Sequence, residues 1–455
     1  MNRSLDSGHR RIRIGAGSAF SDDRIAPAVA LAERGALDYL VFECLAERTV
    51  ARENLTRSKQ PDQGYTPRLI ERLGAVLPAC LRHGTRIVTN MGAAHPVAAA
   101  RAITAHSRMA GSGPIDCAAV TGDDVTDLLR QRPDLKLMET GLPLESILPR
   151  LISANAYLGA DVVARALATE APVVITGRVA DPSLFLAPAL YEFGWSYDDW
   201  ARIASATTLG HLLECAAQVT GGCFADPGKK DVPDLDRLGF PYADIDASGA
   251  FEISKLADQG GRVDRATCTE QLLYEIHDPA RYITPDCVLD ITDVDLVETG
   301  PNRIAVRGAR AQPRTDSYKV TVGYHDGYIG EGQISYAGIN ALARARLAEE
   351  LVKRRLAEAG RQFREVRTDL IGLSSLHGLA TARPEPYEVR LRIAARCDDR
   401  KTAESVGFEV RALHVNGPAS GGGGSDPVVR EVLAVQSVLL PRALVDPQIE
   451  IVRVN

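Results

Sequence analysis

The sequence predicts an α/β protein, with a mainly parallel sheet in a large N-terminal domain and a small α+β domain at the C-terminal end. Five apolar, strand-like runs occur before residue 180, and helical patterns lie between them. Parallel strands need a long crossover, usually a helix, so this alternation favours a parallel sheet. The chain of 455 residues is also long enough for two or three domains of roughly 100–200 residues each. We expect two domains, 1–316 and 317–455.

The predicted strands and helices of the first domain have clear boundaries. The strands are RIRIG (11–15), LDYLVFE (37–43), TRIVTN (85–90), IDCAAVTG (115–122) and APVVITG (171–177). Helices are predicted over residues 25–34, 68–83 and 96–109. The first two end before Gly35 and Gly84 and the third begins at Pro96, because glycine favours helix ends and proline favours the first helical turn.

The rest of the chain divides into a mixed region and a clearer C-terminal pattern. From residue 184 to 316, the helical stretches HLLECAAQVTG and CTEQLLYEIH alternate with turns, and no topology follows. After that come a strand in YIGEGQISYAG, a helix over 341–359, strands in EVRTDLIGL and YEVRLRIAA, a helix over 401–415 and a final strand QIEIVRV. This β-α-β-β-α-β order is the ferredoxin-like pattern. The segment PASGGGGSDP (418–427) interrupts it, either as a flexible loop or as a loop closing over the cleft of another domain or subunit.

Composition weighs against several classes of protein. A formal net charge of −6 lacks the basic footprint of nucleic-acid binding, so we expect no nucleic-acid partner. No apolar run approaches the ~20 residues that span a bilayer, and residues 1–13 are polar and basic, so we expect no membrane partner and a cytoplasmic location. The eight cysteines include no CxxC pair, which indicates reduced thiols, with Cys80, Cys117 and Cys287 in the core.

The carboxyl ends of the predicted parallel strands are polar, and we expect them to line one cleft. The first is GAGSAFSDDR (15–24), a turn that offers backbone N–H groups to an anion. It is no nucleotide fingerprint, because residue 20 is Phe where G-x-G-x-x-G has its last glycine, and the Walker lysine is absent. We expect substrate binding by Gly15, Gly17, Ser18, Ser21 and Asp22; alternatively, Ser21 or Asp22 only caps the following helix.

Two further strand ends carry candidate acid/base groups. Glu43 and Glu47 lie four residues apart in FECLAERT, so a helix or tight turn presents both to the cleft, where one carboxylate raises the pKa of the other. In NMGAAHP, Asn90 is a candidate for substrate binding, and His95, at a helix start, is a candidate general acid/base. The plainer interpretations are a solvated helix start for the glutamates and a hydrogen-bonded structural role for His95.

The last two strand ends complete the predicted cleft. Asp123 follows the fourth strand as a further candidate for acid/base catalysis. Arg178 and Asp181 follow the fifth, and the guanidinium fork of Arg178 suits a substrate carboxylate or phosphate, with Asp181 also binding substrate. Glu43 with Asp123 and Asp124 offers the carboxylates that a magnesium-type ion takes, but no spaced His/Cys/Asp motif supports a metal, so none is predicted and the cofactor stays unknown.

One helix outside these strand ends also carries reactive side chains. His211 and Cys215 lie beside Glu214, four residues apart, and share a helical face. That spacing permits a thiolate nucleophile, although buried packing of both side chains is the favoured interpretation.

Six ordered blocks of the chain resemble the acyclic terpene utilisation protein A family. They are GAGSAFSDDRIAPAVALAERGALDYLVFECLAERT, RIVTNMGAAHPVAAAR, VTGDDV, VITGRVADPSLFLAPALYEFGW, GHLLECAAQVTGG and EQLLYEIHDPARYITPD, within residues 11–320. The resemblance implies a small α+β domain behind them and a pocket that Lys255, Tyr274, Glu275 and Tyr282 help to close. Members accompany acyl-CoA dehydrogenases, carboxylases, hydratases and lyases in the breakdown of branched or terpenoid acids. No established set of catalytic residues carries over.

These observations lead to one expected function and two alternatives. We expect an enzyme of carboxylic acid or acyl-CoA catabolism with lyase or hydratase chemistry, a small-molecule carboxylate or acyl-CoA as its partner, and a homo-oligomer. The first alternative is a non-catalytic binding or assembly subunit of a carboxylase or dehydrogenase system. The second is hydrolysis of an ester, thioester or amide, although the sequence has neither a G-x-S-x-G elbow nor a recognisable triad.

Overall fold

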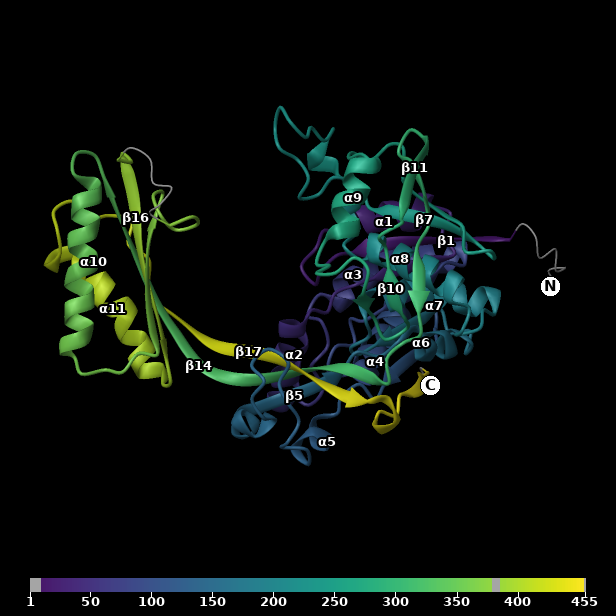
Figure 1. The fold of residues 1–455 in the computed structure, drawn as a ribbon, viewed down its shortest axis with the longest axis horizontal. Coiled ribbons are helices and arrows are strands. Elements are labelled where there is room, and N and C mark those ends of the chain that lie inside the picture. The colour runs from purple at the N-terminus through teal and green to yellow at the C-terminus, as the bar shows by residue number, and fades with distance from the viewer. Residues whose placement is uncertain (1–9, 379–384, 454–455) are drawn as a thin grey trace. The chain divides into compact units, whose positions relative to one another are not determined.

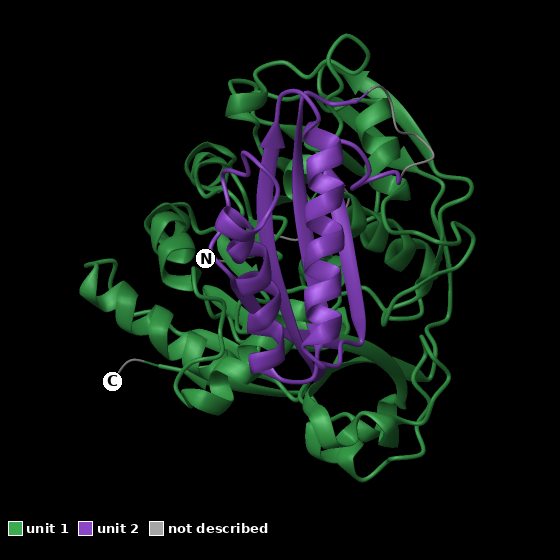
Figure 2. Ribbon diagram, turned by 90° about the vertical axis from the view of Figure 1, so that its left-hand side faces the viewer, with its two compact units in different colours: residues 1–323, 435–455 green, residues 324–434 purple. Residues whose placement is uncertain are grey.

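The structure is a computed structural model that describes residues 10–378 and 385–453. The chain forms two compact units, residues 1–323 with 435–455 (unit 1) and residues 324–434 (unit 2) (Figure 2). It enters unit 2 within strand β14 (Ser317–Ala337) and returns to unit 1 within β17 (Val428–Pro441). The domain boundary expected at residue 316 remains a prediction, and the compact units are a separate description of the chain. The compact units differ from it because the last residues of the chain return to unit 1.

A ten-stranded mixed sheet forms the centre of the described part of unit 1, in the order β11-β12-β8-β7-β1-β2-β3-β6-β4-β18. Its middle five strands pair in parallel. They are β1 (Arg11–Ser18), β2 (Tyr39–Phe42), β3 (Arg86–Thr89), β6 (Val173–Thr176) and β4 (Cys117–Thr121). All five predicted strands are therefore present, and the fold class is confirmed as mixed α/β with one large sheet.

The region from residue 184 to 316, for which no topology was predicted, extends this sheet. The antiparallel strand β7 (Pro241–Asp246) lies beside β1 (Figure 1). It is followed outward by β8 (Phe251–Lys255), β12 (Arg303–Arg307) and β11 (Asp295–Gly300). A small separate sheet joins β13 (Arg310–Gln312), β10 (Val288–Asp290) and β9 (Tyr282–Ile283). Strand β5 (Leu151–Ala156) pairs with β14.

The α-helices in the described part of unit 1 are α1 (Ala26–Arg34), α2 (Glu47–Lys59), α3 (Leu69–His83), α4 (Pro96–Met109), α5 (Thr126–Arg130), α6 (Ala160–Leu167), α7 (Asp181–Phe193), α8 (Trp200–Glu214) and α9 (Arg265–Leu273). Of these, α1, α3 and α4 are the three predicted helices, and their bounds agree with the prediction to within a residue. Gly84 ends α3 in the left-handed conformation, with φ of 72°, as glycine allows. Helix α7 packs against both α6 and α8. Within the described residues, no helix has the length and apolarity needed to cross a bilayer.

Strand β1 continues through Ser18, so Gly15 and Gly17 lie inside a strand and the expected turn begins later. A Cβ on Gly15 would be 2.7 Å from a Leu37 side-chain carbon, and one on Gly17 would be 2.4 Å from the ring of Phe42. These glycines therefore make room for the side chains packed on the strand.

Replacing Gly17 by alanine should destabilise unit 1. Phe42 is fully buried, so its ring cannot move away from the new methyl group. Overpacking of this kind costs about 1–3 kcal/mol, which urea unfolding would report as a lower midpoint. The matched control is Gly300→Ala in β11, where the nearest atom would be 3.6 Å away. Equal midpoints for the two variants would contradict this account of Gly17.

Unit 2 has six elements in β-α-β-β-α-β order, and the first five are the predicted ones. They are β14, α10 (Ala341–Glu358), β15 (Glu365–Ile371), β16 (Glu388–Cys397), α11 (Arg400–Asn416) and β17, with strand order β15-β16-β14-β17. Both helices pack on one face of the sheet (Figure 2). Val389, Leu391 and Ile393 alternate along β16 into the core against them.

Two expectations about the end of the chain need correction. The fourth strand of unit 2 is β17, whereas the predicted final strand QIEIVRV forms β18 (Gln448–Val452) and pairs antiparallel with β4 in unit 1. The glycine run is tied to β14 within unit 2, because Ser335 and Gly422 exchange two backbone hydrogen bonds of 2.8 and 2.9 Å. Strand β17 was missed in the sequence because it directly follows the glycine run, which resembles a loop.

Candidate functional site

Arg178 forms the centre of the candidate site. It follows strand β6 and precedes helix α7, and its side chain is only 2% exposed. One terminal nitrogen donates to Asp181 Oδ1 at 2.8 Å, and the guanidinium lies 4.1 Å from the centre of the Tyr157 ring. Within the described residues, the buried Nε and the other terminal nitrogen have no hydrogen-bond partner. Buried polar groups are normally paired, so these two donors are available to water or to a bound molecule.

Asp123, at the end of β4, holds the backbone of Arg178. Its Oδ2 accepts from the Arg178 backbone N and from Asn155 Nδ2, both at 2.9 Å. A Cβ at Gly177 would be 2.3 Å from Asp123 Oδ1, so the chain passes directly over this carboxyl. Burial is the largest effect on Asp123 and raises its pKa to about 6. These contacts favour a positioning role for Asp123 over the expected acid/base role.

Glu43, Asn90 and Ser18 meet, as expected, at the ends of neighbouring strands. Glu43 Oε1 accepts from the Leu45 backbone N at 2.7 Å and from Asn90 Nδ2 at 3.1 Å, while Ser18 Oγ donates to the Glu43 backbone carbonyl at 2.7 Å. All three predicted residues are buried. Burial raises the pKa of Glu43, with the charge of Arg178 opposing this effect. Burial therefore favours the protonated form of Glu43, and the charge of Arg178 favours its ionised form.

Glu47, the first residue of α2, has the opposite electrostatic character. The Tyr157 hydroxyl donates to its carboxylate, and Lys319 Nζ lies 3.4 Å away. Burial raises the pKa of Glu47, but the charge of Arg178, the Tyr157 hydrogen bond and Lys319 together lower it to about 2. The two predicted glutamates thus face the same arginine with pKa values pushed apart, which is the pattern of an acid/base pair with different roles.

Besides Asp181, Glu43 and Glu47, the charge of Arg178 acts on Glu214 at the end of helix α8. Glu214 is buried, and its Oε1 lies 3.0 Å from His211 Nδ1. Burial raises the pKa of Glu214, whereas His211 and Arg178 lower it. Glu43, Asp181 and Glu214 therefore share one electrostatic environment with Arg178.

Glu214 was not predicted as a site residue, although the sequence carried a signal for it. His211 and Glu214 are three residues apart on an almost fully buried helix, a spacing that also places side chains on one face. The thiol of Cys215, the partner considered at four residues, has its pKa raised by burial, which opposes a thiolate. Of the residues named from the resemblance, Glu275 and Tyr282 lie within electrostatic reach of Glu214. Lys255 instead donates to Gln259 O at 2.5 Å, and Tyr274 is 39% exposed.

The turn after β1 binds two arginines through its carbonyl groups. Arg72, which is fully buried, donates to the carbonyls of Ser21 at 3.1 Å and Asp23 at 2.8 Å, and Arg68 donates to that of Asp22 at 3.1 Å. The Asp23 side chain accepts from the backbone N of Ala19 at 2.8 Å. The alternative that Ser21 or Asp22 caps the following helix is wrong, because no side chain caps α1, whose N-cap is Ile25. Among the described contacts, neither Ser21 nor Asp22 reaches Arg178.

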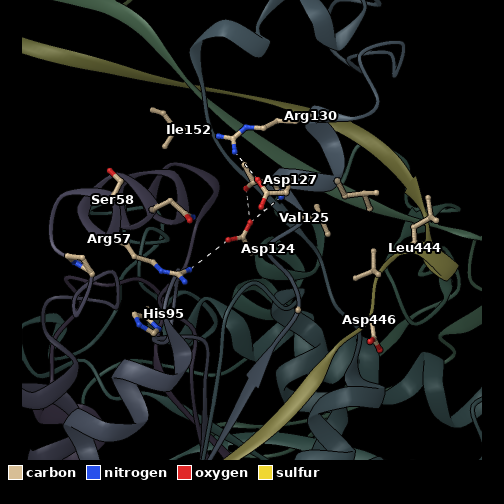
Figure 3. Close-up of a pocket in the computed structure, with 16 residues that line it drawn as sticks. Arg57, Ser58, His95, Asp124, Val125, Asp127, Arg130, Ile152, Leu444 and Asp446 are labelled. Atoms are coloured by element: carbon tan, nitrogen blue, oxygen red, sulfur yellow. Dashed lines mark hydrogen bonds and ion pairs between the residues drawn. The ribbon is translucent and has the colours of Figure 1, made fainter.

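His95 lies in a different place, an open pocket of about 710 Å³ in unit 1 (Figure 3). Arg57 points toward Asp124 there, at 3.8 Å, and Arg130 toward Asp127, at 2.8 Å. Burial lowers the pKa of His95, as do the neighbouring charges of Arg57 and Arg101. Among the described contacts, His95 reaches neither Arg178 nor Glu43, whereas the charge of Asp124 acts on its neighbour Asp123.

Hydrogen bonds connect this pocket to the candidate site. Asn54, in the pocket wall, donates to Asn155 Oδ1 at 3.1 Å, and Asn155 donates to Asp123, which holds the Arg178 backbone. Over residues 10–378 and 385–453, no group of three or more His, Cys, Asp or Glu side chains is placed to hold a metal ion. The eight cysteines are free, with Cys80, Cys117 and Cys287 buried as predicted.

Fold and site together define a mixed α/β protein with a buried arginine, ringed by carboxyl groups, at the carboxyl ends of its parallel strands. The family model described as acyclic terpene utilisation family protein AtuA matches residues 12–451, and the chain belongs to this family. The family is implicated in acyclic terpene utilisation, which agrees with a catabolic role. Comparisons with curated proteins and with solved structures gave no match.

Proposed function

We propose that this protein is an enzyme of carboxylic acid or acyl-CoA catabolism that performs acid/base lyase or hydratase chemistry at Arg178. The observation that carries the proposal is the buried guanidinium with two unpaired donors, surrounded by carboxyl groups of different pKa. The N–H groups of a guanidinium donate to carboxylate oxygens, and Arg178 has unpaired donors on Nε and on one terminal nitrogen. Arg178 would therefore hold the carboxylate, or the thioester carbonyl, of the substrate.

The chemistry requires two groups that exchange protons. When water is eliminated from a hydroxy acid, one group takes the proton from the carbon next to the carbonyl. The electrons of that C–H bond form the double bond, the C–O bond breaks, and the departing oxygen takes a proton from the second group to leave as water. Glu43 supplies one of these groups, because its Oε1 is fixed by Leu45 and Asn90 while Oε2 makes no hydrogen bond among the described residues. Glu47 stays ionised and balances Arg178.

Thermal stability of the purified protein tests the proposal with a ligand panel. The panel comprises short carboxylic acids, di- and tricarboxylates, their CoA thioesters, nucleotides and divalent ions. A ligand that binds only the folded state stabilises it by about 2.7 kcal/mol at a hundred times its dissociation constant. We expect carboxylates or CoA thioesters to raise the melting temperature. Stabilisation by nucleotides alone would contradict the proposal.

Binding of such a carboxylate should weaken as the pH rises. The pKa values of Glu43 and Asp181 are raised, with burial the largest cause, and an anion beside these groups favours their protonated forms further. Binding therefore takes up protons, and affinity falls as the pH rises from the raised pKa values of the free protein through the higher values in the complex. Calorimetry in two buffers of different ionisation enthalpy measures this uptake. A dissociation constant independent of pH and of buffer would contradict it.

Two other assignments have less support from the site. A non-catalytic assembly subunit is favoured by unit 2, for which we propose the ferredoxin-like type from its element and strand order. It would bind carboxylates without changing them. Hydrolysis needs an activated nucleophile, and the Cys44 thiol beside Ser18 does not fit this role because burial raises its pKa to about 12. The cytoplasmic location and the homo-oligomer remain predictions.

A further inference from the structure

His211 is held by two acceptors whose geometry restricts where its protons lie. Its Nε2 is 3.1 Å from the carbonyl oxygen of Leu272, and its Nδ1 is 3.0 Å from Glu214 Oε1. A carbonyl oxygen only accepts, so Nε2 carries a hydrogen. The second hydrogen bond then contains one proton, either on Nδ1 of an imidazolium facing a carboxylate or on Oε1 of a neutral Glu214.

The other oxygen of Glu214 points away from this bond. Oε2 is buried and has no hydrogen-bond partner in the described parts of the chain. The charged and titratable groups that face Glu214 come from several elements: Arg178 after β6, Asp181 at the start of α7, Glu43 after β2, Glu275 after α9 and Tyr282 on β9. The Tyr282 ring lies edge-on to His211, 5.4 Å between centres. An unpaired carboxyl oxygen therefore shares a buried environment with the unpaired donors of Arg178.

We infer that Glu214 is the second proton-exchanging residue of the site and that His211 is its positioning residue, with Oε2 facing the substrate. The inference rests on the proposed function, because elimination and addition of water need two such groups. In elimination, ionised Glu214 takes the carbon-bound proton on Oε2, and protonated Glu43 gives its proton to the departing oxygen. Solvent then removes the proton from Glu214 and returns one to Glu43. His211, with Nδ1–H toward Oε1, keeps Glu214 ionised before the reaction.

The ring nitrogens of His211 report on this pair without any substrate. In protein with ¹⁵N-labelled histidines, nine in all, the His211 signals are assigned by their absence from His211→Gln. We expect both nitrogens of His211 to stay protonated to higher pH than in an unperturbed histidine. In Glu214→Gln, whose amide can donate to Nδ1, the ring should become the neutral Nε2–H form at lower pH. Glu270→Gln, an exposed carboxyl of α9 paired with Lys230, is the matched control and should change nothing.

A second readout separates this inference from the proposed function. With a carboxylate that binds Arg178, in D₂O, Glu214→Gln should lose incorporation of deuterium on carbon while keeping the affinity of wild type. Unchanged incorporation in Glu214→Gln, together with its loss in Glu43→Gln, would overturn the inference and leave the proposed function standing. An imidazole titration that Glu214→Gln does not move would also overturn it. Absence of exchange in wild type would overturn the proposed function, while the imidazole titration still tests the pair by itself.

Discussion

Arg178→Lys is expected to weaken binding of the best carboxylate ligand by about 10- to 100-fold. A hydrogen bond to a charged group contributes roughly 1.5–3 kcal/mol, and 1.4 kcal/mol is tenfold in affinity. Lysine keeps the positive charge beside Asp181 but has one donating nitrogen in place of the three of the guanidinium. The loss therefore reports the hydrogen bonds of the guanidinium more than its charge. Isothermal titration calorimetry measures it directly.

The matched control is Arg442→Lys. Arg442 stacks on Tyr318 at 4.2 Å, much as Arg178 stacks on Tyr157 at 4.1 Å, and its Nε donates to Thr315 O at 2.7 Å. Its replacement removes a stacked arginine from unit 1 without touching the groups around Arg178. Carboxylate affinity should be unchanged in this variant. Equal affinities of wild type and Arg178→Lys for the ligand would show that the anion binds elsewhere.

Glu43→Gln is expected to lower the rate of proton exchange with substrate by about 10²- to 10⁴-fold, the usual contribution of a positioned acid/base group. The glutamine oxygen can still accept from Leu45 N and Asn90 Nδ2, so the fold and the position of the side chain should be kept. Affinity for the carboxylate should stay the same or rise, because the amide cannot become negative. Mass spectrometry of deuterium uptake gives the rate, and calorimetry gives the affinity.

Glu53→Gln serves as the control for this variant. Glu53 is 2% exposed on α2, and burial raises its pKa as it does that of Glu43, with Arg52 as its charged partner. It should exchange protons with substrate at the rate of wild type. A Glu43→Gln protein that retains the wild-type rate would remove Glu43 from the mechanism, whatever the control shows.

The parallel strands and their polar ends could be predicted because burial on both faces makes such strands continuous apolar runs. From that pattern, Glu43, Glu47, Asn90 and Arg178 could be brought to one edge of the sheet. The separation of His95 from them could not be predicted. A strand end shows which edge a residue reaches, but the direction of the following chain decides which neighbours it meets.

Other features depended on contacts that sequence patterns do not carry. In the sequence, Gly15 and Gly17 fit a turn as well as a strand. The side chains of Leu37 and Phe42, which pack against these glycines, explain why they lie in a strand. His211 was considered with Cys215, whereas its hydrogen bond is with Glu214, because both spacings share a helical face. Tyr157, which stacks on Arg178, lies in the loop after β5, a strand whose partner β14 is far away in the chain.

Deuterium exchange by the wild-type protein tests the central claim most directly. The carboxylate or CoA thioester that binds wild type and loses affinity in Arg178→Lys is incubated with the protein in D₂O, and its mass is followed over time. We expect deuterium on the carbon next to the carbonyl, and we expect wild type to incorporate it faster than Glu43→Gln. A ligand that depends on Arg178 for binding but gains no deuterium with wild type would contradict acid/base chemistry at this site.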